Sequence, residues 1–432
     1  MGAHKTVFPG TVSGRVTIPA SKSLSHRAMI CAALANGDST LRHVSWSKDL
    51  EATAFAMERM GAIFWRDGDT LTIRGIGVNL LRGKVERLFC GESASTVRFL
   101  IPIAGVLGLR TIFTGMGQLA KRPLDPYIHL MEEHGFGFEQ ESGDQLPLLI
   151  KGGWTSGHFT LPGNISSQFI TGLLMALPLV DGDSVIELST PLESAPYVAM
   201  TIQVLGQFGI HIESEDYRVF RVKGGQQYQP GRLSLEGDYT QASIFLAAGA
   251  IAAEAEGVIL DGLRPDSIQG DKEILHLLEQ MQVETRWLPD GGLEILPAEQ
   301  IQNFTWNAAQ NPDLVPAVAV VSAFGEGMMR IVGASRLRLK ECDRIQALCT
   351  EFKKMGVWID ESEDGLVIRG EPDGLFEGGE ADSWNDHRVA MSLAVLALRT
   401  FQGIGIQNAD CTSKSWPSFW NDFEQIGGGI ED

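Results

Sequence analysis

The chain has 432 residues, more than one hydrophobic core usually holds, so at least two domains are expected. It carries 35 basic and 54 acidic residues, and a formal net charge of −19 disfavours nucleic acid or an anionic membrane as a partner. Charged residues make up 21% and hydrophobic residues 44%, which excludes a disordered or fibrous chain. Any bound anion must therefore be held locally, by individual arginines, lysines and helix N-termini.

The cysteines and the apolar runs exclude several further classes of protein. The five cysteines are scattered without a CxxC pair, so neither a disulfide framework nor a zinc site is indicated. Apolar runs such as 169–180 and 314–324 reach about a dozen residues, short of the roughly 18 that a membrane-spanning helix needs. Residues 1–8 hold no apolar signal region. We therefore expect a cytoplasmic protein without membrane contact.

One pattern recurs six times along the chain. Each copy begins with a small polar cluster, continues through an apolar helical run and a β-branched strand, and then has an amphipathic helix that ends near a glycine. These end markers stand at positions 61, 135, 209, 282, 356 and 427, so successive copies are 71–74 residues apart. The fourth marker is Gln282, and the others are glycines. This period fits a small α/β unit with two helices and several strands.

The first helix of each unit is predicted to begin at its polar cluster, where Ser, Thr, Asp or Asn can cap it. In chain order the clusters are Ser21-Lys22-Ser23, Gly91-Glu92-Ser93, Ser166-Ser167-Gln168, Asp238-Tyr239-Thr240, Pro312-Asp313 and Asn385-Asp386-His387-Arg388. The helices that follow, such as 245–253, are apolar on nearly all faces and should be buried. Six units suggest two domains of three, with a crossover around 231–237.

Several helix starts also carry basic residues. Lys22 and Arg27 flank the first start, Arg98 lies in the second, and His387 and Arg388 lie in the sixth. Capping alone explains an isolated polar cluster, but it does not explain cations at several of them. Helix starts that converge on one cleft would hold a multiply anionic substrate.

Two basic clusters lie between the helices of their units. Lys121-Arg122-Pro123 precedes the second helix of unit two, and residues 336–344, RLRLKECDR, stand at the same place in unit five. An alternating run of this kind is also typical of a solvated edge strand, but its place in the repeat favours a functional loop. Lys414 occupies the corresponding loop of unit six.

Other motifs are absent or weak. The sequence has no P-loop, HExxH or GxSxG motif, which disfavours the chemistries that these motifs support. His129, Glu133 and His134 can share a helix face with a metal, but a surface cluster is the simpler interpretation.

Five motifs in order resemble the EPSP synthase family, the 3-phosphoshikimate 1-carboxyvinyltransferases, over essentially the whole chain. Residues 19–28, PASKSLSHRA, resemble the signature PGSKSxSxRA; residues 340–344, KECDR, resemble K-E-T/S-D-R; residues 385–391, NDHRVAM, resemble N-D-H-R-M-A-M. Ser166-Ser167-Gln168-Phe169 and Lys121-Arg122-Pro123 also fit. The resemblance implies a two-domain inside-out α/β barrel, each domain with three copies of the α/β unit. It assigns residues 21–236 to one domain and residues 1–20 plus 237–432 to the other, with the active site in the cleft between them.

The resemblance also implies the reaction. The family transfers the enolpyruvyl group of phosphoenolpyruvate to the 5-hydroxyl of shikimate 3-phosphate and releases phosphate, by addition and elimination, without a metal or organic cofactor. The implied catalytic residues are Asp313 as the base toward the hydroxyl, Glu341 as the proton donor to the methylene carbon, and Lys22 as stabiliser of the tetrahedral intermediate. We expect a monomer of the shikimate pathway whose partners are these two small-molecule substrates.

The same resemblance implies two sets of binding residues, rich in arginine because its planar fork suits phosphate and carboxylate groups. The shikimate 3-phosphate set is Lys22, Ser23, Arg27, Ser166, Ser167, Gln168, Ser194, Tyr197, Asp313 and Lys340. The phosphoenolpyruvate set is Lys22, Ala94, Arg122, Gln168, Arg344, His387, Arg388 and Lys414.

The chain departs from the family pattern in two places. Residues 91–98 read GESASTVR where G-N-A-G-T-x-x-R is common, so Glu92 places a carboxylate near an anion site, where it would pair with Arg98 or cap a helix. Ala94 replaces a glycine that lines the phosphoenolpyruvate site in glyphosate-sensitive relatives, which implies tolerance of glyphosate. Arg336 stands where relatives often have Asn.

Alternatives from neighbouring classes fit less well. The sister family, UDP-N-acetylglucosamine enolpyruvyl transferase, has Lys-Asn at Lys22-Ser23 and usually a reactive cysteine near Arg122, whereas the nearest cysteine here is Cys90. A catalytically dead, phosphate-sensing relative would be expected to have lost Lys22, Asp313 or Glu341. RNA 3′-phosphate cyclases share related repeats, but a net charge of −19 fits poorly with nucleic acid.

Overall fold

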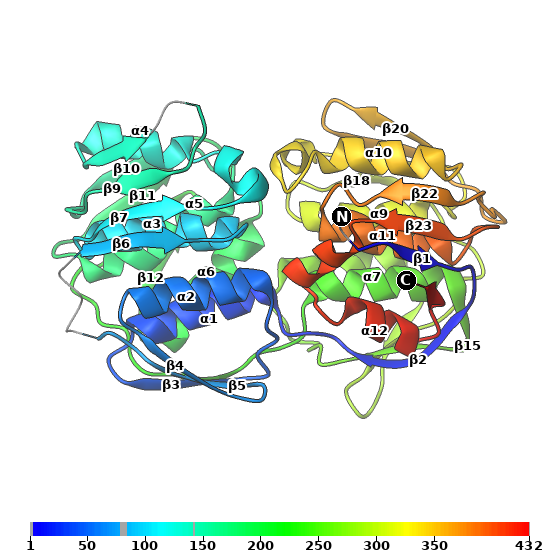
Figure 1. Cartoon of the computed structure of the whole chain (residues 1–432), viewed down its shortest axis with the longest axis horizontal. Coiled ribbons are helices and arrows are strands. Elements are labelled where there is room, and N and C mark those ends of the chain that lie inside the picture. The colour runs from blue at the N-terminus through cyan, green and yellow to red at the C-terminus, as the bar shows by residue number, and fades with distance from the viewer. Residues whose placement is uncertain (1–2, 78–83, 141–142, 432) are drawn as a thin grey trace. The chain divides into compact units, whose positions relative to one another are not determined.

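The computed structural model describes residues 3–77, 84–140 and 143–431, with the backbone alone for 84–86 (Figure 1). The chain divides into two compact units. We call Ser21–Leu235 the N-terminal unit, and Met1–Ala20 together with Glu236–Asp432 the C-terminal unit. The chain therefore passes between the units twice, and its second passage lies within residues 231–237. Each unit holds three of the six repeats.

Two α-helices per repeat lie where the sequence predicts them. The first helices are α1 (Lys22–Leu34), α3 (Ala94–Val106), α5 (Ser167–Ala176), α7 (Tyr239–Ala252), α9 (Val315–Ser322) and α11 (His387–Ala397). The second helices are α2 (Lys48–Arg59), α4 (Asp125–His134), α6 (Ala195–Gln207), α8 (Glu273–Gln280), α10 (Arg344–Lys354) and α12 (Phe419–Gln425). The predicted burial of the first helices is confirmed most clearly for α7, α9 and α11, which are buried at every residue and contact one another.

Side-chain caps fix the starts of most first helices. The oxygen of the capping residue accepts a hydrogen bond from a backbone N–H of the first turn, which satisfies a donor that the helix itself leaves unpaired. The caps of α1, α3, α5, α7 and α11 are Ser21, Ser93, Ser166, Asp238 and Asp386. The cap of α3 is therefore Ser93 and not its neighbour Glu92.

The described residues form six four-stranded sheets, one for each repeat. The N-terminal unit contributes β3 (Asp38–Arg42), β4 (Ile63–Asp67), β5 (Thr70–Arg74), β6 (Lys84–Phe89), β7 (Arg110–Thr114), β8 (Phe138–Gln140), β9 (Leu148–Ile150), β10 (His158–Leu161), β11 (Ser184–Leu188), β12 (Ile212–Glu215), β13 (Val219–Val222) and β14 (Arg232–Ser234). The C-terminal unit contributes β1 (Lys5–Val7), β2 (Val12–Thr17), β15 (Ala253–Asp261), β16 (Thr285–Trp287), β17 (Leu293–Ile295), β18 (Thr305–Asn307), β19 (Met328–Val332), β20 (Trp358–Ser362), β21 (Gly365–Arg369), β22 (Gly379–Asp382), β23 (Ile404–Gln407) and β24 (Ile430–Glu431).

Every sheet repeats one pattern of strand directions. In the third repeat β10 is parallel to β11, which pairs antiparallel with β13, and β13 pairs antiparallel with β12. Strands distant in sequence complete three of the sheets: β14 pairs with β3, β2 with β15, and β1 lies between β23 and β24. The two ends of the chain are therefore joined within the C-terminal unit.

Short 3-10 helices occupy loops that precede the second helices. They are η1 (Gly117–Lys121), η3 (Gly270–Lys272), η5 (Ser335–Leu339) and η6 (Ala409–Lys414). The edge-strand interpretation of residues 336–344 is therefore wrong. In η5 the Leu337 side chain is buried, and its N–H donates to the carbonyl of Ala334, so a tight turn rather than strand pairing satisfies the backbone.

The six end markers share one backbone conformation. Gly61, Gly135, Gly209, Gly356 and Gly427 all have positive φ, and Gln282 also does, at 63°. Glycine adopts this conformation without the steric cost of a Cβ atom, which explains its recurrence after the second helices. Among the described residues, none of the helices has the length and hydropathy that crossing a membrane requires.

Candidate active site

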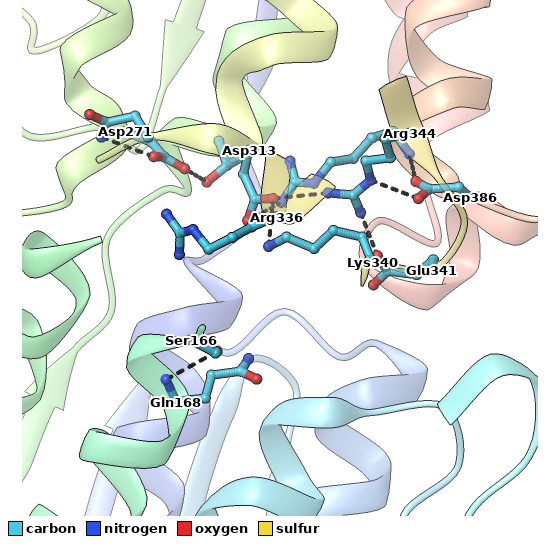
Figure 2. A network of polar contacts seen from close by, with 12 residues as sticks. Ser166, Gln168, Asp271, Asp313, Arg336, Lys340, Glu341, Arg344 and Asp386 are labelled. Carbon is cyan, nitrogen blue, oxygen red and sulfur yellow. Dashed lines mark hydrogen bonds and ion pairs between the residues drawn. The ribbon is translucent and has the colours of Figure 1, made fainter. Parts of the chain in front are cut away.

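Arg344 is the centre of a charge cluster in the C-terminal unit (Figure 2). Its side chain is 2% exposed and donates from each nitrogen to a different carboxylate. Nε lies 2.7 Å from Asp386 Oδ2, Nη1 lies 2.9 Å from Asp313 Oδ1, and Nη2 lies 2.6 Å from Glu341 Oε2. Burial alone would lower the pKa of Arg344, but the three carboxylates raise it above its ordinary value. Arg344 is therefore a permanent cation that fixes the directions of all three carboxylates.

Loops of two successive repeats deliver these groups. Asp313 lies in the short 3-10 helix η4 (Pro312–Leu314), which leads into α9. Arg344 is the first residue of α10, whose start is capped by Asp343. Asp386 caps α11 with Oδ1, which accepts from the N–H of Arg388 at 2.9 Å, and thus keeps Oδ2 for Arg344.

Asp313 also faces two further cations. Lys340 Nζ lies 3.2 Å from its Oδ1, and Arg388 Nη2 lies 3.5 Å from its Oδ2. Burial alone would raise the pKa of Asp313, but Lys340, Arg388 and Arg344 together hold it well below its ordinary value. Asp313 is therefore ionised at neutral pH and free of a proton of its own, as a base must be.

Glu341, His387 and Cys342 complete the cluster. Lys414 Nζ lies 3.7 Å from Glu341 Oε1. His387 is buried beside Asp386, with 3.9 Å between Nδ1 and Oδ1. The thiol of Cys342 lies 3.7 Å from Asp386 Oδ2. The C-terminal unit thus brings together all its predicted site residues: three carboxylates, counting Asp386, meet four cations, which are Lys340, Arg344, Arg388 and Lys414.

Asp271 extends this cluster and was missed from the sequence. It is buried in η3, accepts from Asn311 Nδ2 at 3.3 Å and contacts the hydroxyl of Thr240. Burial and the neighbouring charge of Asp313 raise the pKa of Asp271. Its place in the loop that carries basic residues in other repeats was the available signal, but an acidic residue did not fit that pattern.

In the N-terminal unit, Lys22 is the first residue of α1 and pairs with a carboxylate at the start of α2. Its Nζ lies 2.9 Å from Asp49 Oδ2, and the Asp49 side chain is 7% exposed. Sequence reasoning also missed Asp49. It stands 12 residues before the end marker Gly61, as Arg344 stands 12 before Gly356, so the repeat itself carried the signal.

Arg27 is buried among neutral oxygens. Nε donates to Thr201 Oγ1 at 2.8 Å, Nη1 to the carbonyl of Ser23 at 2.8 Å, and Nη2 to the carbonyl of Tyr197 at 3.1 Å and to Thr171 Oγ1 at 3.5 Å. Burial lowers the pKa of Arg27 to about 10, so the guanidinium still carries its charge at neutral pH. The structure thus brings Ser23, Arg27 and Tyr197 together, and it makes Arg27 a buried cation held by neutral groups.

Gln168 joins two of the other helix starts. Its Oε1 accepts from Arg98 Nη1 at 2.9 Å, and its Nε2 donates to Ser95 Oγ at 3.0 Å. The N–H of Gln168 donates to the capping hydroxyl of Ser166, and Figure 2 shows this pair. Arg98 also donates to the carbonyl of Pro123, so it ties the starts of α3 and α5 to the loop after η1.

The remaining predicted residues of the N-terminal unit lie at helix starts or at the end of a 3-10 helix. Ser167 and Ala94 are the first residues of α5 and α3, and Ser194 stands before α6 with a positive φ of 55°. Arg122 directly follows η1. Glu92 faces Gly117, where a Cβ atom would lie 2.3 Å from Glu92 Oε1, so its carboxylate rests against the start of η1.

The match to known proteins decides the family. The family model described as EPSP synthase (3-phosphoshikimate 1-carboxyvinyltransferase) matches residues 8–423. The chain belongs to the EPSP synthase family. It is 42% identical to the 3-phosphoshikimate 1-carboxyvinyltransferase of Clostridium acetobutylicum over 99% of this chain and 98% of the relative. It is 40% identical to that of Clostridium kluyveri, with the same coverage.

A solved EPSP synthase has the same fold. The structure from Acinetobacter baumannii superposes with a TM-score of 0.83 and 26% sequence identity, over 99% of both chains. The predicted α/β fold of the EPSP synthase family is therefore confirmed. In the part of the chain that the structure describes, no group of His, Cys, Asp and Glu side chains is arranged to hold a metal ion, and His129, Glu133 and His134 form no such site.

Proposed function

We propose that this EPSP synthase family member transfers the enolpyruvyl group of phosphoenolpyruvate to the 5-hydroxyl of shikimate 3-phosphate and releases phosphate, the activity in its relatives' names. One observation carries the assignment beyond the family match. Arg344 holds two carboxylates, Asp313 and Glu341, at 2.9 and 2.6 Å, which supplies a base and an acid in one rigid arrangement. Addition of a hydroxyl to a carbon–carbon double bond needs both groups.

In the addition step, Asp313 accepts the proton of the 5-hydroxyl of shikimate 3-phosphate, and the oxygen of that hydroxyl attacks C2 of phosphoenolpyruvate. Glu341 donates a proton to the methylene carbon C3. The double bond between C2 and C3 becomes a single bond, C3 becomes a methyl group, and C2 becomes the tetrahedral centre of the intermediate. Lys22 stabilises the charge of this intermediate. Anionic substrate groups bound beside Arg344 and Lys414 would offset the positive charge that these cations present to Glu341, which favours a protonated Glu341 before the transfer.

In the elimination step, the bond between C2 and the phosphate oxygen breaks. Glu341 takes back one proton from the methyl group, the double bond forms again, and the proton held by Asp313 passes to the departing phosphate or to water. Atoms and charges balance without a redox step, because every transfer is of a proton or of the enolpyruvyl group.

The proposed binding residues for each substrate come from both units. Shikimate 3-phosphate would be held by the helix starts and hydroxyls around Arg27 and Gln168, with Lys340 and Asp313 from the C-terminal unit. Phosphoenolpyruvate would be held by Arg122, Arg344, Arg388, His387 and Lys414, beside Ala94, with Lys22 and Gln168 shared between the substrates. An active site shared by the two domains, a monomeric state and a cytoplasmic location stay predictions.

A phosphate-release assay tests the proposal. The purified chain is supplied with phosphoenolpyruvate and either shikimate 3-phosphate or UDP-N-acetylglucosamine, and free phosphate is followed. We expect phosphate release when shikimate 3-phosphate is the acceptor and none when UDP-N-acetylglucosamine is the acceptor. Turnover with only the sugar nucleotide would assign the chain to the sister activity, and no turnover with either acceptor would contradict an enzymatic function.

A further inference from the structure

Glu351 is a buried carboxylate that the proposed reaction does not use. It lies seven residues after Arg344 on α10, so the two side chains share one face of the helix. The Glu351 side chain is 1% exposed, while its ion-pair partner Lys354, 2.8 Å away, is 48% exposed. Burying a carboxylate is costly unless its oxygens accept hydrogen bonds, so its contacts identify what it holds.

Both oxygens of Glu351 accept from the end of β22 and the turn that follows it. Oε1 accepts from the indole Nε1 of Trp384 at 2.8 Å, and Oε2 accepts from the backbone N–H of Asp382 at 3.2 Å. Asp382 in turn accepts from the N–H of Trp384 at 2.7 Å through its own carboxylate. Glu351 thus holds the start of turn 383–386 against α10.

This turn has a backbone that needs such support. Trp384 and Asn385 have φ of 54° and 53°, two successive residues in a region that side chains with a Cβ atom rarely adopt. A bulky residue stays there only where surrounding contacts determine its conformation. Here the indole of Trp384 is bound by Glu351, and the N–H of Asn385 donates to Ser383 Oγ at 3.1 Å.

The strained turn delivers active-site groups directly. The next residue, Asp386, is fully buried, caps α11 and binds Arg344 Nε at 2.7 Å. His387 and Arg388 follow it as the first residues of α11. Asp382 also contacts Asn408 Nδ2 at 3.4 Å, and Asn408 stands before η6, which ends at Lys414. The position of Asp386 therefore depends on the turn, and the turn is fixed by Glu351.

We propose that Glu351 is a positioning residue of this enzyme. Through Trp384 it holds the strained turn that sets Asp386 against Arg344, and it thereby orients the guanidinium for the carboxylate or phosphate of phosphoenolpyruvate. The proposal rests on the proposed function for the identity of that ligand. The contacts of Glu351 themselves are a property of the C-terminal unit alone.

A double-mutant cycle tests this role. Trp384→Phe removes the indole N–H, and Glu351→Gln removes the charge while leaving one acceptor oxygen. Each should raise the KM for phosphoenolpyruvate about 10-fold, because a lost hydrogen bond to a charged group is of that size. The KM for shikimate 3-phosphate should stay within about twofold. The double variant should resemble the worse single variant, because both changes break one contact.

Lys354→Gln is the matched control, since it removes the exposed partner of Glu351 without touching the turn, and its KM values should stay at wild type. A purely structural role would lower the melting temperature and the active fraction but leave KM unchanged. The proposal is overturned by an unchanged KM for phosphoenolpyruvate, by equal rises in both KM values, or by additive effects.

Hydrogen exchange separates failure of this inference from failure of the proposed function. Amides of residues 382–388 should lose protection in Trp384→Phe and keep it in Lys354→Gln. If the wild type shows no turnover with shikimate 3-phosphate, the proposed function fails, and exchange alone then decides whether Glu351 holds the turn. Equal protection in both variants would overturn it.

Discussion

The two units hold their buried arginines by opposite means. In the C-terminal unit Arg344 is paired with Asp313, Glu341 and Asp386, so its charge is more than balanced. In the N-terminal unit Arg27 is equally buried, and within the described residues it donates to hydroxyl and carbonyl oxygens only. The guanidinium of Arg27 therefore keeps a positive charge that an anionic ligand can use. Around Arg344, by contrast, three carboxylates offset the positive charge, and two of them, Asp313 and Glu341, are the groups proposed for proton transfer.

The largest effect is expected when Asp313, the proposed base, is replaced. We expect Asp313→Asn to lower kcat by about 10²- to 10⁴-fold, the usual contribution of general base catalysis. The melting temperature should fall because the ion pairs of Asp313 with cations are lost, but the fold should stay intact because Arg344 keeps two carboxylate partners. Steady-state kinetics of Asp313→Asn beside Asp360→Asn, an exposed carboxylate paired with Lys353, measures the effect. A near-normal kcat for Asp313→Asn would show that the proton leaves by another route.

Removal of one methyl group in the N-terminal unit, by Ala94→Gly, tests how the site discriminates between phosphoenolpyruvate and the inhibitor glyphosate. Ala94 begins α3 and is 4% exposed. Glyphosate in its extended form is slightly longer than phosphoenolpyruvate, so the extra methyl of Ala94 should obstruct it more. We expect Ala94→Gly to increase sensitivity to glyphosate about 10- to 200-fold, with little change in the KM for phosphoenolpyruvate.

Inhibition titrations of wild type and Ala94→Gly at one fixed phosphoenolpyruvate concentration measure this. Equal, tight inhibition of both proteins would show that Ala94 does not shape the site in this way. The contact of Glu92 with Gly117 would then be the first feature to alter, because it borders the same loop.

Removal of the Arg27 charge tests the N-terminal half of the comparison. Arg27→Met should raise the KM for shikimate 3-phosphate about 10- to 100-fold and change kcat less, because a charged hydrogen-bond donor is lost but no proton-transfer group. Arg74→Met, an exposed pair with Asp38 in the same unit, is the control and should leave KM unchanged. A fall in kcat alone would mean that Arg27 acts on the transition state instead.

The pH dependence of the unfolding free energy should reveal the charge state of Asp313 in the cluster around Arg344. The folded pKa of Asp313 is depressed, so its stabilising contribution is present above the ordinary aspartate value of about 4 and is lost as the pH falls through the folded value. The difference in unfolding free energy between wild type and Asp313→Asn should therefore shrink below about pH 4. Denaturant titrations between about pH 3 and 7 measure it, and a difference that grows on acidification would contradict the assigned charge state.

The smallest effect concerns a position where the six repeats are otherwise alike. Gln282 adopts φ of 63° where the other five markers are glycine. Gln282→Gly should raise the unfolding free energy by about 1 kcal/mol or less, because relief of the left-handed strain exceeds the added flexibility of the unfolded chain. Gly135→Gln is the matched reverse change, since its φ is 67° and a Cβ atom there meets nothing within 4 Å. It should lower the unfolding free energy, and equal melting temperatures for all three proteins would refute the strain argument.

Local signals carried most of the fold. Five of the six polar clusters supply the predicted cap of a first helix, because capping is a matter of neighbouring residues, whereas α9 follows the 3-10 helix η4 without a side-chain cap. The recurring glycines marked turns whose φ only glycine adopts easily. For residues 336–344 the alternating pattern left an edge strand as the alternative to a functional loop. Alternation describes a strand only where a partner strand is present, and here Leu337 is buried in a 3-10 turn instead.

The sequence by itself determined the family, the repeat and the residue types of the site, since these depend on order and spacing along one chain. Only the tertiary structure decided which charges meet. Asp313 and Asp386 lie 31 and 42 residues from Arg344, and Asp49 lies 27 residues from Lys22. No local rule pairs side chains over such separations, because the partner is chosen by how helix starts pack together, within one repeat for Asp313 and Asp49 and between two repeats for Asp386. The dependence of Asp386 on Glu351 arises in the same way.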